Sequence, residues 1–291
     1  MTDLQKYKNI ASTVTAAAVF VYTLVRPSAV TAEASKSLAF CLAVIIPSLF
    51  VNMALAAYLF PRMVNAMKGR HTAAVALVCG ILCGFPVGAD IAVRLRKNGA
   101  GQNYADYINS FANNAGISFV ISFAGISALK SIKAGVTLVV LEVLSALICA
   151  FVMKSVLHPD TECALPRQNE ISFADALRGA VKSMAAVCGS IIAFACFSSI
   201  ITVFASEGSV AYTLIKGFLE FSGGIAEAAY LPVYIDFICT AVFIGWSGFC
   251  VMMQVQTVGA GKLRIKYYLL SKLLQALLMG GMAAIAVKLI Y

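Results

Sequence analysis

The chain has 291 residues, of which 61% are hydrophobic and 12% are charged, and its formal net charge is +9 at pH 7. Soluble domains carry about a quarter charged residues, so this composition excludes an ordinary soluble protein and indicates a polytopic membrane protein. The basic residues stand in short clusters between apolar runs, as they do in cytoplasmic loops. We therefore expect the lipid bilayer as a partner, and no nucleic acid.

Cysteine and histidine spacing gives no sign of a metal or a cofactor. The nine cysteines include no C-x-x-C pair, and most lie within apolar runs, where cysteine behaves as a small hydrophobe. The sequence has two histidines and lacks a P-loop, a nucleophile elbow and a dinucleotide fingerprint. We expect no disulfide framework, no metal, no cofactor and no enzymatic activity.

Residues 1–37 are predicted to form an N-terminal transmembrane span and a connector. Two lysines precede the apolar run 10–27, and small residues follow at 30–32, a pattern that also fits a cleavable signal peptide. Because the chain continues as a membrane bundle, we favour an uncleaved first span.

Seven apolar runs are long enough to cross a bilayer, which takes about 20 residues. They cover residues 10–27, 38–60, 108–129, 134–156, 181–205, 232–257 and 267–289. Two further segments, about 73–93 and 210–230, begin with roughly ten apolar residues and then reach a glycine-rich interruption. A lipid-facing helix tolerates such an interruption poorly, because freed backbone groups need partners. Both segments are therefore predicted to be re-entrant hairpins.

Basic residues on both sides of segment 73–93 predict that it enters and leaves through one membrane face. The flanking residues are Arg62, Lys68, Arg70, Arg94, Arg96 and Lys97. With both hairpins re-entrant, 15 of the 22 Lys and Arg residues fall on the cytoplasmic side and 6 on the other, while Lys272 lies within a span. The positive-inside rule then places the N-terminus in the cytoplasm and the C-terminus outside.

This threading contains a repeat. Residues 38–156 and 181–291 share the order span, re-entrant hairpin, span, span, with the second copy inverted in the membrane, and a polar cytoplasmic connector (157–180) joins them. Short matches support the repeat, with Gly84-Phe85 aligned to Gly217-Phe218 and Gly116 aligned to Gly248. We predict an all-α polytopic membrane protein built from an inverted repeat and preceded by one extra N-terminal span, a plan found in secondary transporters.

The stretch CGFPVGAD, residues 83–90, is predicted to form a hairpin tip at a solute site. Gly84 and Gly88 allow bent backbone and close approach of a ligand, and Pro86 prevents a regular helix from continuing. The alternative for one such motif is a packing interface or a simple kink, since Gly and Pro are common in membrane helices. Two interrupted hairpins in equivalent places favour the solute site.

Four stretches, CGFPVGADIAVRLRKNG, SFANNAGISFVI, GFLEFSGGI and GWSGFCVMMQVQTV, follow one another between residues 83 and 258. Together they resemble the YlbJ-type sporulation integral membrane proteins, whose nucleoside-recognition (Gate) domain is related to concentrative nucleoside transporters. The resemblance implies a role in endospore formation and the transport of a small solute, with dipicolinate import into the forespore suggested. It also implies a location in the cell membrane or in a membrane around the forespore.

Polar residues at the interruptions are the further candidates for binding the solute. The side-chain amides of Asn113 and Asn114 both donate and accept hydrogen bonds, with helix capping as the alternative role. Ser247 and Gln254 lie seven residues apart after the Gly245 break, on one face of a helix. The candidates from the second hairpin are Ser222 and Gly223.

Acidic residues at membrane depth cost about 2.5–3.5 kcal/mol on insertion scales, so each needs a partner or a task. Asp90 and Glu220 fall at or beside the two hairpin tips, where either can bind a coupling cation or proton. Glu142 and Lys272 occupy equivalent positions in the two repeats, which predicts a buried ion pair.

Together these patterns predict a membrane transporter of endospore formation that moves a small solute, anionic or nucleoside-like, by alternating access. Two other functions remain open at this point: a non-transporting membrane scaffold of a sporulation assembly, and a channel-type pore. Besides the solute and the bilayer, the expected partners are further copies of the chain or other sporulation membrane proteins.

Overall fold

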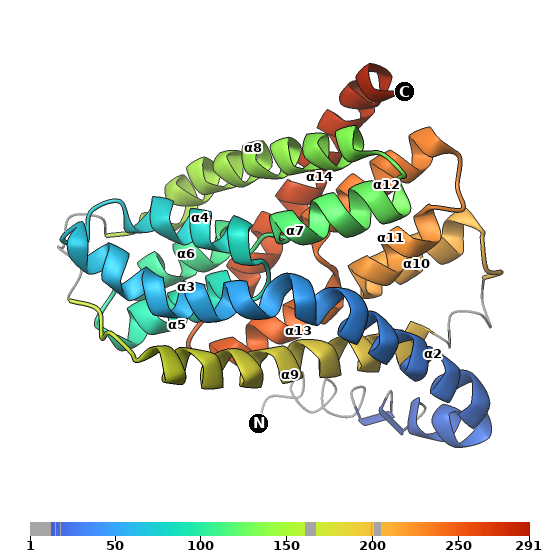
Figure 1. The fold of residues 1–291 in the computed structure, drawn as a ribbon, viewed down its shortest axis with the longest axis horizontal. Coiled ribbons are helices and arrows are strands. Elements are labelled where there is room, and N and C mark those ends of the chain that lie inside the picture. Colours follow the sequence, from blue (N-terminus) through green and yellow to red (C-terminus); the bar gives the residue numbers. More distant parts are fainter. Residues whose placement is uncertain (1–12, 15, 18, 161–166, 199, 201–204) are drawn as a thin grey trace.

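The computed structural model describes residues 13–291 apart from 15, 18, 161–166, 199 and 201–204. Every regular element in the described part of the chain is helical (Figure 1). Among the described residues, five helices are long and apolar enough to cross a membrane: Pro27–Ala66, Ile132–Leu157, Phe173–Ser198, Val233–Gly259 and Ile265–Lys288. The prediction of an all-α polytopic membrane protein is confirmed.

The first half of the structure contains a long helix, a helical hairpin, a broken helix and a second long helix. These are α2 (Pro27–Phe40) continued by the π-helical turn η1 (Cys41–Ile45) and α3 (Ile46–Ala66), then α4 (Thr72–Cys83) and α5 (Val87–Lys97), then α6 (Gln102–Phe111), α7 (Ile117–Phe119) and η2 (Val120–Ala128), then α8 (Ile132–Leu157). We call α4 and α5 the first hairpin, and residues 112–116 the first break.

The second half has the same order of elements. It consists of α9 (Phe173–Ser198), α10 (Val210–Leu219) and α11 (Phe221–Ala228), α12 (Val233–Trp246) and α13 (Gly248–Gly259), and α14 (Ile265–Ile290). We call α10 and α11 the second hairpin, and Ser247–Gly248 the second break. Equivalent helices of the two halves also contact each other, α3 against α9 and α8 against α14. The halves therefore pack together as two related units.

The two hairpins enter the bundle from opposite ends (Figure 1). Four loops meet at the end of the bundle that carries the first hairpin. Gln168 accepts two of the hydrogen bonds that join them, its backbone oxygen from Asn65 Nδ2 at 3.0 Å and its Oε1 from Asn98 Nδ2 at 2.8 Å. The third runs from Gln102 Nε2 to Lys262 O at 2.9 Å. Most of the basic clusters of the sequence lie in or beside these loops. The two hairpins therefore point in opposite directions, and the basic clusters gather at one end of the bundle.

The N-terminal part of the bundle differs from the prediction. The expected connector around 28–37 is helical, because Pro27 suits the first turn of a helix and no Gly or Pro follows until Pro47, just after η1. The resulting helix Pro27–Ala66 has 40 residues, or about 60 Å at about 1.5 Å per residue, roughly twice the hydrocarbon thickness. The predicted first span, 10–27, begins outside the described residues.

Two predicted spans are broken in the middle. The run 108–129 belongs to a helix that begins at Gln102 and is interrupted by the first break, where Asn113, Asn114 and Gly116 stand. The run 232–257 is interrupted where Ser247 and Gly248 have φ values of 68° and 82°. Left-handed backbone of this kind ends a helix.

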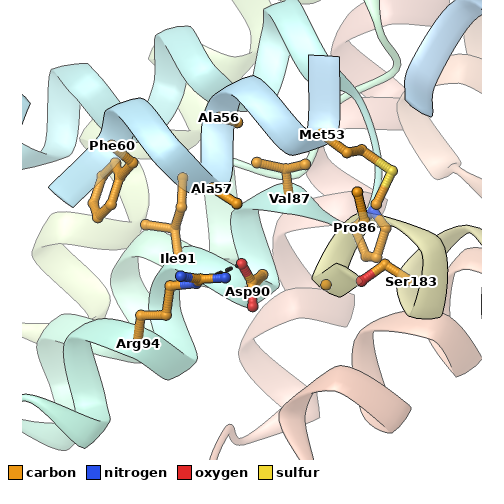
Figure 2. Close-up of a pocket in the computed structure, with 12 residues that line it drawn as sticks. Met53, Ala56, Ala57, Phe60, Pro86, Val87, Asp90, Ile91, Arg94 and Ser183 are labelled. Carbon is orange, nitrogen blue, oxygen red and sulfur yellow. Dashed lines mark hydrogen bonds and ion pairs between the residues drawn. The ribbon is translucent and has the colours of Figure 1, made fainter. Parts of the chain in front are cut away.

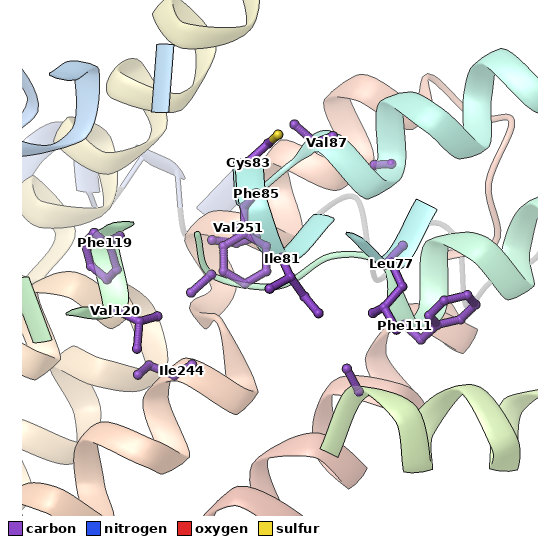
Figure 3. Packing of buried hydrophobic residues seen from close by; sticks show 14 of the residues in the cluster. Leu77, Ile81, Cys83, Phe85, Val87, Phe111, Phe119, Val120, Ile244 and Val251 are labelled. Carbon is purple, nitrogen blue, oxygen red and sulfur yellow. The ribbon is translucent and has the colours of Figure 1, made fainter. Parts of the chain in front are cut away.

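Glycines let the first hairpin approach the first break closely. A Cβ atom at Gly80 would lie 1.8 Å from the Ala112 carbonyl oxygen, and one at Gly88 would lie 2.4 Å from the same atom. Apolar side chains fill the space around this contact, among them Leu77, Ile81 and Phe111 (Figure 3). The hairpin is therefore held by backbone-to-backbone packing.

We predict that Gly80→Ala destabilises the protein, since the added methyl group meets backbone that cannot rotate away. Overpacking of this kind costs about 1–3 kcal/mol. Gly281→Ala is the matched control, because Gly281 is a helical glycine with open space around its Cβ position. Thermal denaturation in detergent, followed by size-exclusion chromatography, measures both variants. Equal melting temperatures for the two variants would contradict the close packing.

Candidate functional site

The tips of the two hairpins meet near the middle of the bundle. The first tip contains Gly84, with a φ of 79°, followed by Phe85 and Pro86, which are joined by a cis peptide bond. The ring of Phe85 lies 5.7 Å from the ring of Phe221 at the second tip, and the ring of Phe119 lies 5.3 Å from Phe221, measured between centroids. Three aromatic rings therefore close the centre of the bundle.

Each hairpin tip packs against the break of its own half. A Cβ atom at Gly84 would lie 3.0 Å from the backbone nitrogen of Gly116, and one at Gly248 would lie 3.1 Å from the backbone nitrogen of Phe221. The predicted match of Gly116 with Gly248 agrees with this geometry. The match of Gly84 with Gly217 does not, because Gly217 lies within α10, against the ring of Phe243, and the second tip comes later.

Asn113 and Asn114 bind other parts of the protein. Asn113 Oδ1 accepts from the backbone nitrogen of Ala89, at the start of α5, at 2.9 Å, and its Nδ2 donates to Asn109 O at 2.7 Å. Asn114 Nδ2 donates to a backbone carbonyl at 2.9 Å, and its Oδ1 accepts from Gln275 Nε2 at 3.0 Å. Both side chains are fully buried. Their amides hold the first break to the first hairpin and to α14.

Glu142 and Lys272 also bind the first break, one on each side. Glu142 Oε1 accepts from the backbone nitrogen of Ala115 at 2.6 Å, and its Oε2 has no partner among the described residues. Lys272 Nζ donates to the carbonyl oxygen of Asn113 and to Gln275 Oε1. The predicted direct ion pair is absent from the salt bridges of the described chain. The two charges instead stabilise two different backbone groups.

The two candidate coupling acids have different surroundings. Glu220 is 4% exposed and caps α11: its Oε1 accepts from the backbone nitrogen and the hydroxyl of Ser222, at 3.0 and 2.6 Å, and its Oε2 from the backbone nitrogen of Gly223 at 2.5 Å. Asp90 lies one turn into α5, where its carboxylate pairs with Arg94 at 2.7 Å, and its side chain is 39% exposed.

A cavity of about 220 Å³ opens beside the second hairpin, between it and helices α2 and α9. We call it the α10–α11 cavity. Its charged lining residues are Glu33, Lys36, Lys216, Glu220 and Glu227. Lys216 Nζ lies 3.0 Å from a Glu227 oxygen and 4.0 Å from a Glu33 oxygen, so the side chain bridges the hairpin to α2.

A smaller hollow of about 80 Å³ lies beside the first hairpin. Figure 2 shows Pro86, Asp90 and Arg94 beside this hollow, together with Met53 of α3 and Ser183 of α9, which lie on either side of Pro86. We call it the α4–α5 cavity. The two hairpins thus each border a hollow, at the two ends of the bundle.

A third hollow of about 20 Å³ lies between the hairpin tips. We call it the central cavity. It is lined by Phe85, Phe119, Phe221, Gly116 and Gln254, among others, and it shares Ile191 with the α10–α11 cavity. The three aromatic rings therefore line this central cavity, which shares no lining residue with the α4–α5 cavity.

The predicted binding residues divide into two groups. Those that line a cavity are Pro86, Asp90, Glu220, Ser222, Gly223 and Gln254. Those that shape the breaks and tips are Gly84, Gly88, Asn113, Asn114 and Ser247. Ser247 lies at the second break, where its hydroxyl is 2.8 Å from the hydroxyl of Tyr268, so Ser247 and Gln254 do not form one continuous helical face.

Sequence reasoning missed the charged cluster of Glu33, Lys36 and Lys216 in the α10–α11 cavity. One signal was present, because Lys216 interrupts an otherwise apolar run, and a charge at that depth marks a functional position. The contact between Lys216 and Glu33 joins residues that are far apart in the sequence, so no local sequence pattern predicts it.

Comparison of the chain with protein-family models, curated proteins and solved structures finds no match. The resemblance to the sporulation membrane proteins therefore stays a prediction.

We predict that Glu142→Gln and Lys272→Met destabilise the protein independently. Lys272→Met removes the donor to a buried carbonyl, which costs about 1–3 kcal/mol, whereas Glu142→Gln keeps an acceptor for Ala115 and costs less. The double variant should melt below either single variant, because the two side chains satisfy different atoms. Lys288→Met, at an exposed position of α14, is the control. Recovery of stability in the double variant would instead indicate a direct pair.

Proposed function

We propose that the chain is a membrane transporter that moves a small solute by alternating access. One observation carries the proposal: two hairpins that enter from opposite ends meet tip to tip at Phe85 and Phe221, with a hollow behind each. Inverted repeats with broken helices and a site near the membrane midplane are the usual construction of secondary transporters. The two broken helices and the two opposed hairpins of the described chain support this construction.

The three cavities differ in size, and this difference indicates which conformational state of the transport cycle the structure represents. The α10–α11 cavity has about 220 Å³, the α4–α5 cavity about 80 Å³ and the central cavity about 20 Å³. A solute therefore has room on the side of the second hairpin and is blocked by the aromatic rings from the other side. Transport in this proposal requires the tips to separate from the breaks and the smaller cavity to widen.

The orientation follows from charge. The end that gathers the basic loops is the cytoplasmic end under the positive-inside rule, which places the N-terminus in the cytoplasm. The α10–α11 cavity then opens away from the cytoplasm. The membrane in this proposal is the cell membrane or one that surrounds the forespore, and endospore formation is the process that the sequence resemblance supports.

Asp90 and Glu220 are the coupling acids in this proposal. Each borders the cavity of its own hairpin, and the carboxylate of Asp90 is the more accessible of the two. Glu220 holds the second tip together, so binding of a proton or cation there would loosen the hydrogen bonds to Ser222 and Gly223. This links ion binding to the shape of the hairpin.

One observation favours the scaffold function as a second candidate. The amides of Asn113 and Asn114 are satisfied by protein groups, as expected where broken helices serve as packing surfaces. A scaffold of this kind would bind other membrane proteins and would move no solute.

Counterflow in proteoliposomes tests the proposal. Vesicles loaded with unlabelled dipicolinate or uridine should accumulate the same labelled compound, because a carrier exchanges solute across the membrane and a pore does not. We expect this counterflow to stop when Glu33→Cys and Lys216→Cys are joined by a short bis-thiosulfonate, each end of which forms a reducible disulfide with one cysteine and releases a sulfinate. This cross-link fastens the second hairpin to α2. Reduction should restore counterflow. The nine native cysteines are replaced first.

Each single cysteine variant, treated with the same reagent, controls for loss of the charged side chains. Counterflow that persists in the cross-linked protein would contradict movement of the second hairpin. If folded protein shows no counterflow of any tested solute, the scaffold function is favoured.

A further inference from the structure

Gln254 lines a cavity, and its side chain has one buried polar atom that has no hydrogen-bond partner among the described residues. The residue is 4% exposed, lines the central cavity and donates from Nε2 to the hydroxyl oxygen of Ser190 at 2.8 Å. Its Oε1 is buried and has no hydrogen-bond partner among the described residues. A buried carbonyl without a partner costs about 1–3 kcal/mol, so this atom is suited to bind something that the cavity receives.

The orientation of the Gln254 amide is fixed by its neighbours. The Ser190 hydroxyl donates its single proton to Val187 O at 2.8 Å, so toward Gln254 it can only accept. The thiol of Cys250 also points at the Ser190 oxygen, at 3.5 Å. The NH₂ group of Gln254 must therefore face Ser190, which leaves the carbonyl oxygen as a free acceptor on a residue that lines the central cavity.

The size of the space limits what reaches this acceptor. The central cavity, about 20 Å³, holds one water molecule or one hydroxyl group. The α10–α11 cavity, which shares Ile191 with it, has about 220 Å³, and about 150 Å³ is enough for a benzene-sized molecule. A small solute can lie in the larger cavity and extend one polar group into the smaller one.

Charge in the larger cavity does not favour an anion. Its lining carries three glutamates and two lysines, and Lys216 is already paired with Glu227 at 3.0 Å. Lys272 lies 5.2 Å from the Phe85 ring, but it lines none of the three cavities and is committed to Asn113 and Gln275. A carboxylate would thus meet a net negative wall and, at Gln254, a second acceptor.

We infer that the solute is uncharged and places an O–H or N–H donor on Gln254 Oε1. This inference rests on the proposed function, because it assumes that a solute enters between the hairpins. It favours a donor-bearing neutral solute over a dicarboxylate such as dipicolinate.

Two compounds of the same shape test the inference: dipicolinate, and the pyridine dimethanol in which hydroxymethyl groups replace both carboxylates. Binding to the purified full-length protein is followed by the fluorescence of Trp246, the sole tryptophan of the chain, whose indole lies 5.7 Å from the ring of Phe218 on the second hairpin. We expect the dimethanol to bind at least about ten-fold more tightly than dipicolinate.

Three variants test whether Gln254 is responsible for the tighter binding of the dimethanol. Gln254→Leu should weaken dimethanol binding about ten-fold, whereas Gln256→Leu, at an exposed position of the same helix, should leave it unchanged. Ser190→Ala removes the nearer acceptor of the amide and leaves only Cys250 Sγ, at 3.5 Å, so Gln254 can more easily turn its NH₂ group to the cavity. The ratio of the affinity for the dimethanol to the affinity for dipicolinate should then fall.

Tighter binding of dipicolinate by the wild-type protein overturns the inference, as does unchanged dimethanol binding in Gln254→Leu. Absence of dimethanol binding to folded protein also overturns it. The proposed function is judged separately, because counterflow of dipicolinate or another solute would support transport even if the dimethanol failed to bind.

Discussion

Backbone groups freed where helices break inside a membrane need partners, and the rest of this structure depends on how that need is met. At the first break, Lys272 binds the carbonyl of Asn113 just after α6 ends, and Glu142 binds the amide of Ala115 just before α7 begins. A cation thus stands at the negative end of one half-helix and an anion at the positive end of the next, as helix dipoles favour. The first hairpin packs on this stabilised break.

The second break meets the same need with different chemistry. Ser247 and Gly248 have left-handed backbone, the Ser247 hydroxyl contacts Tyr268, and the indole of Trp246 donates to Phe218 O at 3.0 Å. No charged side chain among the described residues binds this break; Glu220 of the same half instead caps α11 at the hairpin and lines the larger cavity. The two halves share the same order of elements but stabilise their breaks with different side chains.

Much of this plan was predictable because residues with strong backbone preferences mark it. Gly84, Pro86 and Gly116 interrupt apolar runs at positions that the structure confirms as a tip and a break. The early start of α9 was missed although Ser172 caps it, its hydroxyl accepting from the backbone nitrogen of Asp175 at 3.1 Å. This capping residue could be recognised from the local sequence, but the predicted start of the helix was placed by hydropathy alone, at residue 181.

Contacts between distant residues were not predictable in the same way. The equivalence of Glu142 and Lys272 was visible in the sequence, yet which backbone atoms they bind depends on where the freed groups point after folding. The bridge from Lys216 to Glu33 and the orientation of Gln254 by Ser190 likewise arise from helix packing. The periodicity and composition of the sequence do not predict which distant residues will contact each other.

The position of Lys272 also sets an order of events during synthesis. Its partner Asn113 precedes it by 159 residues, so the ribosome must complete most of the second half before the donor for that carbonyl exists. Until then the first half enters the membrane with an unfinished break, whose carbonyl must be served by water or by the insertion machinery. The first break therefore has all of its described hydrogen-bond partners only once α14 has packed against it.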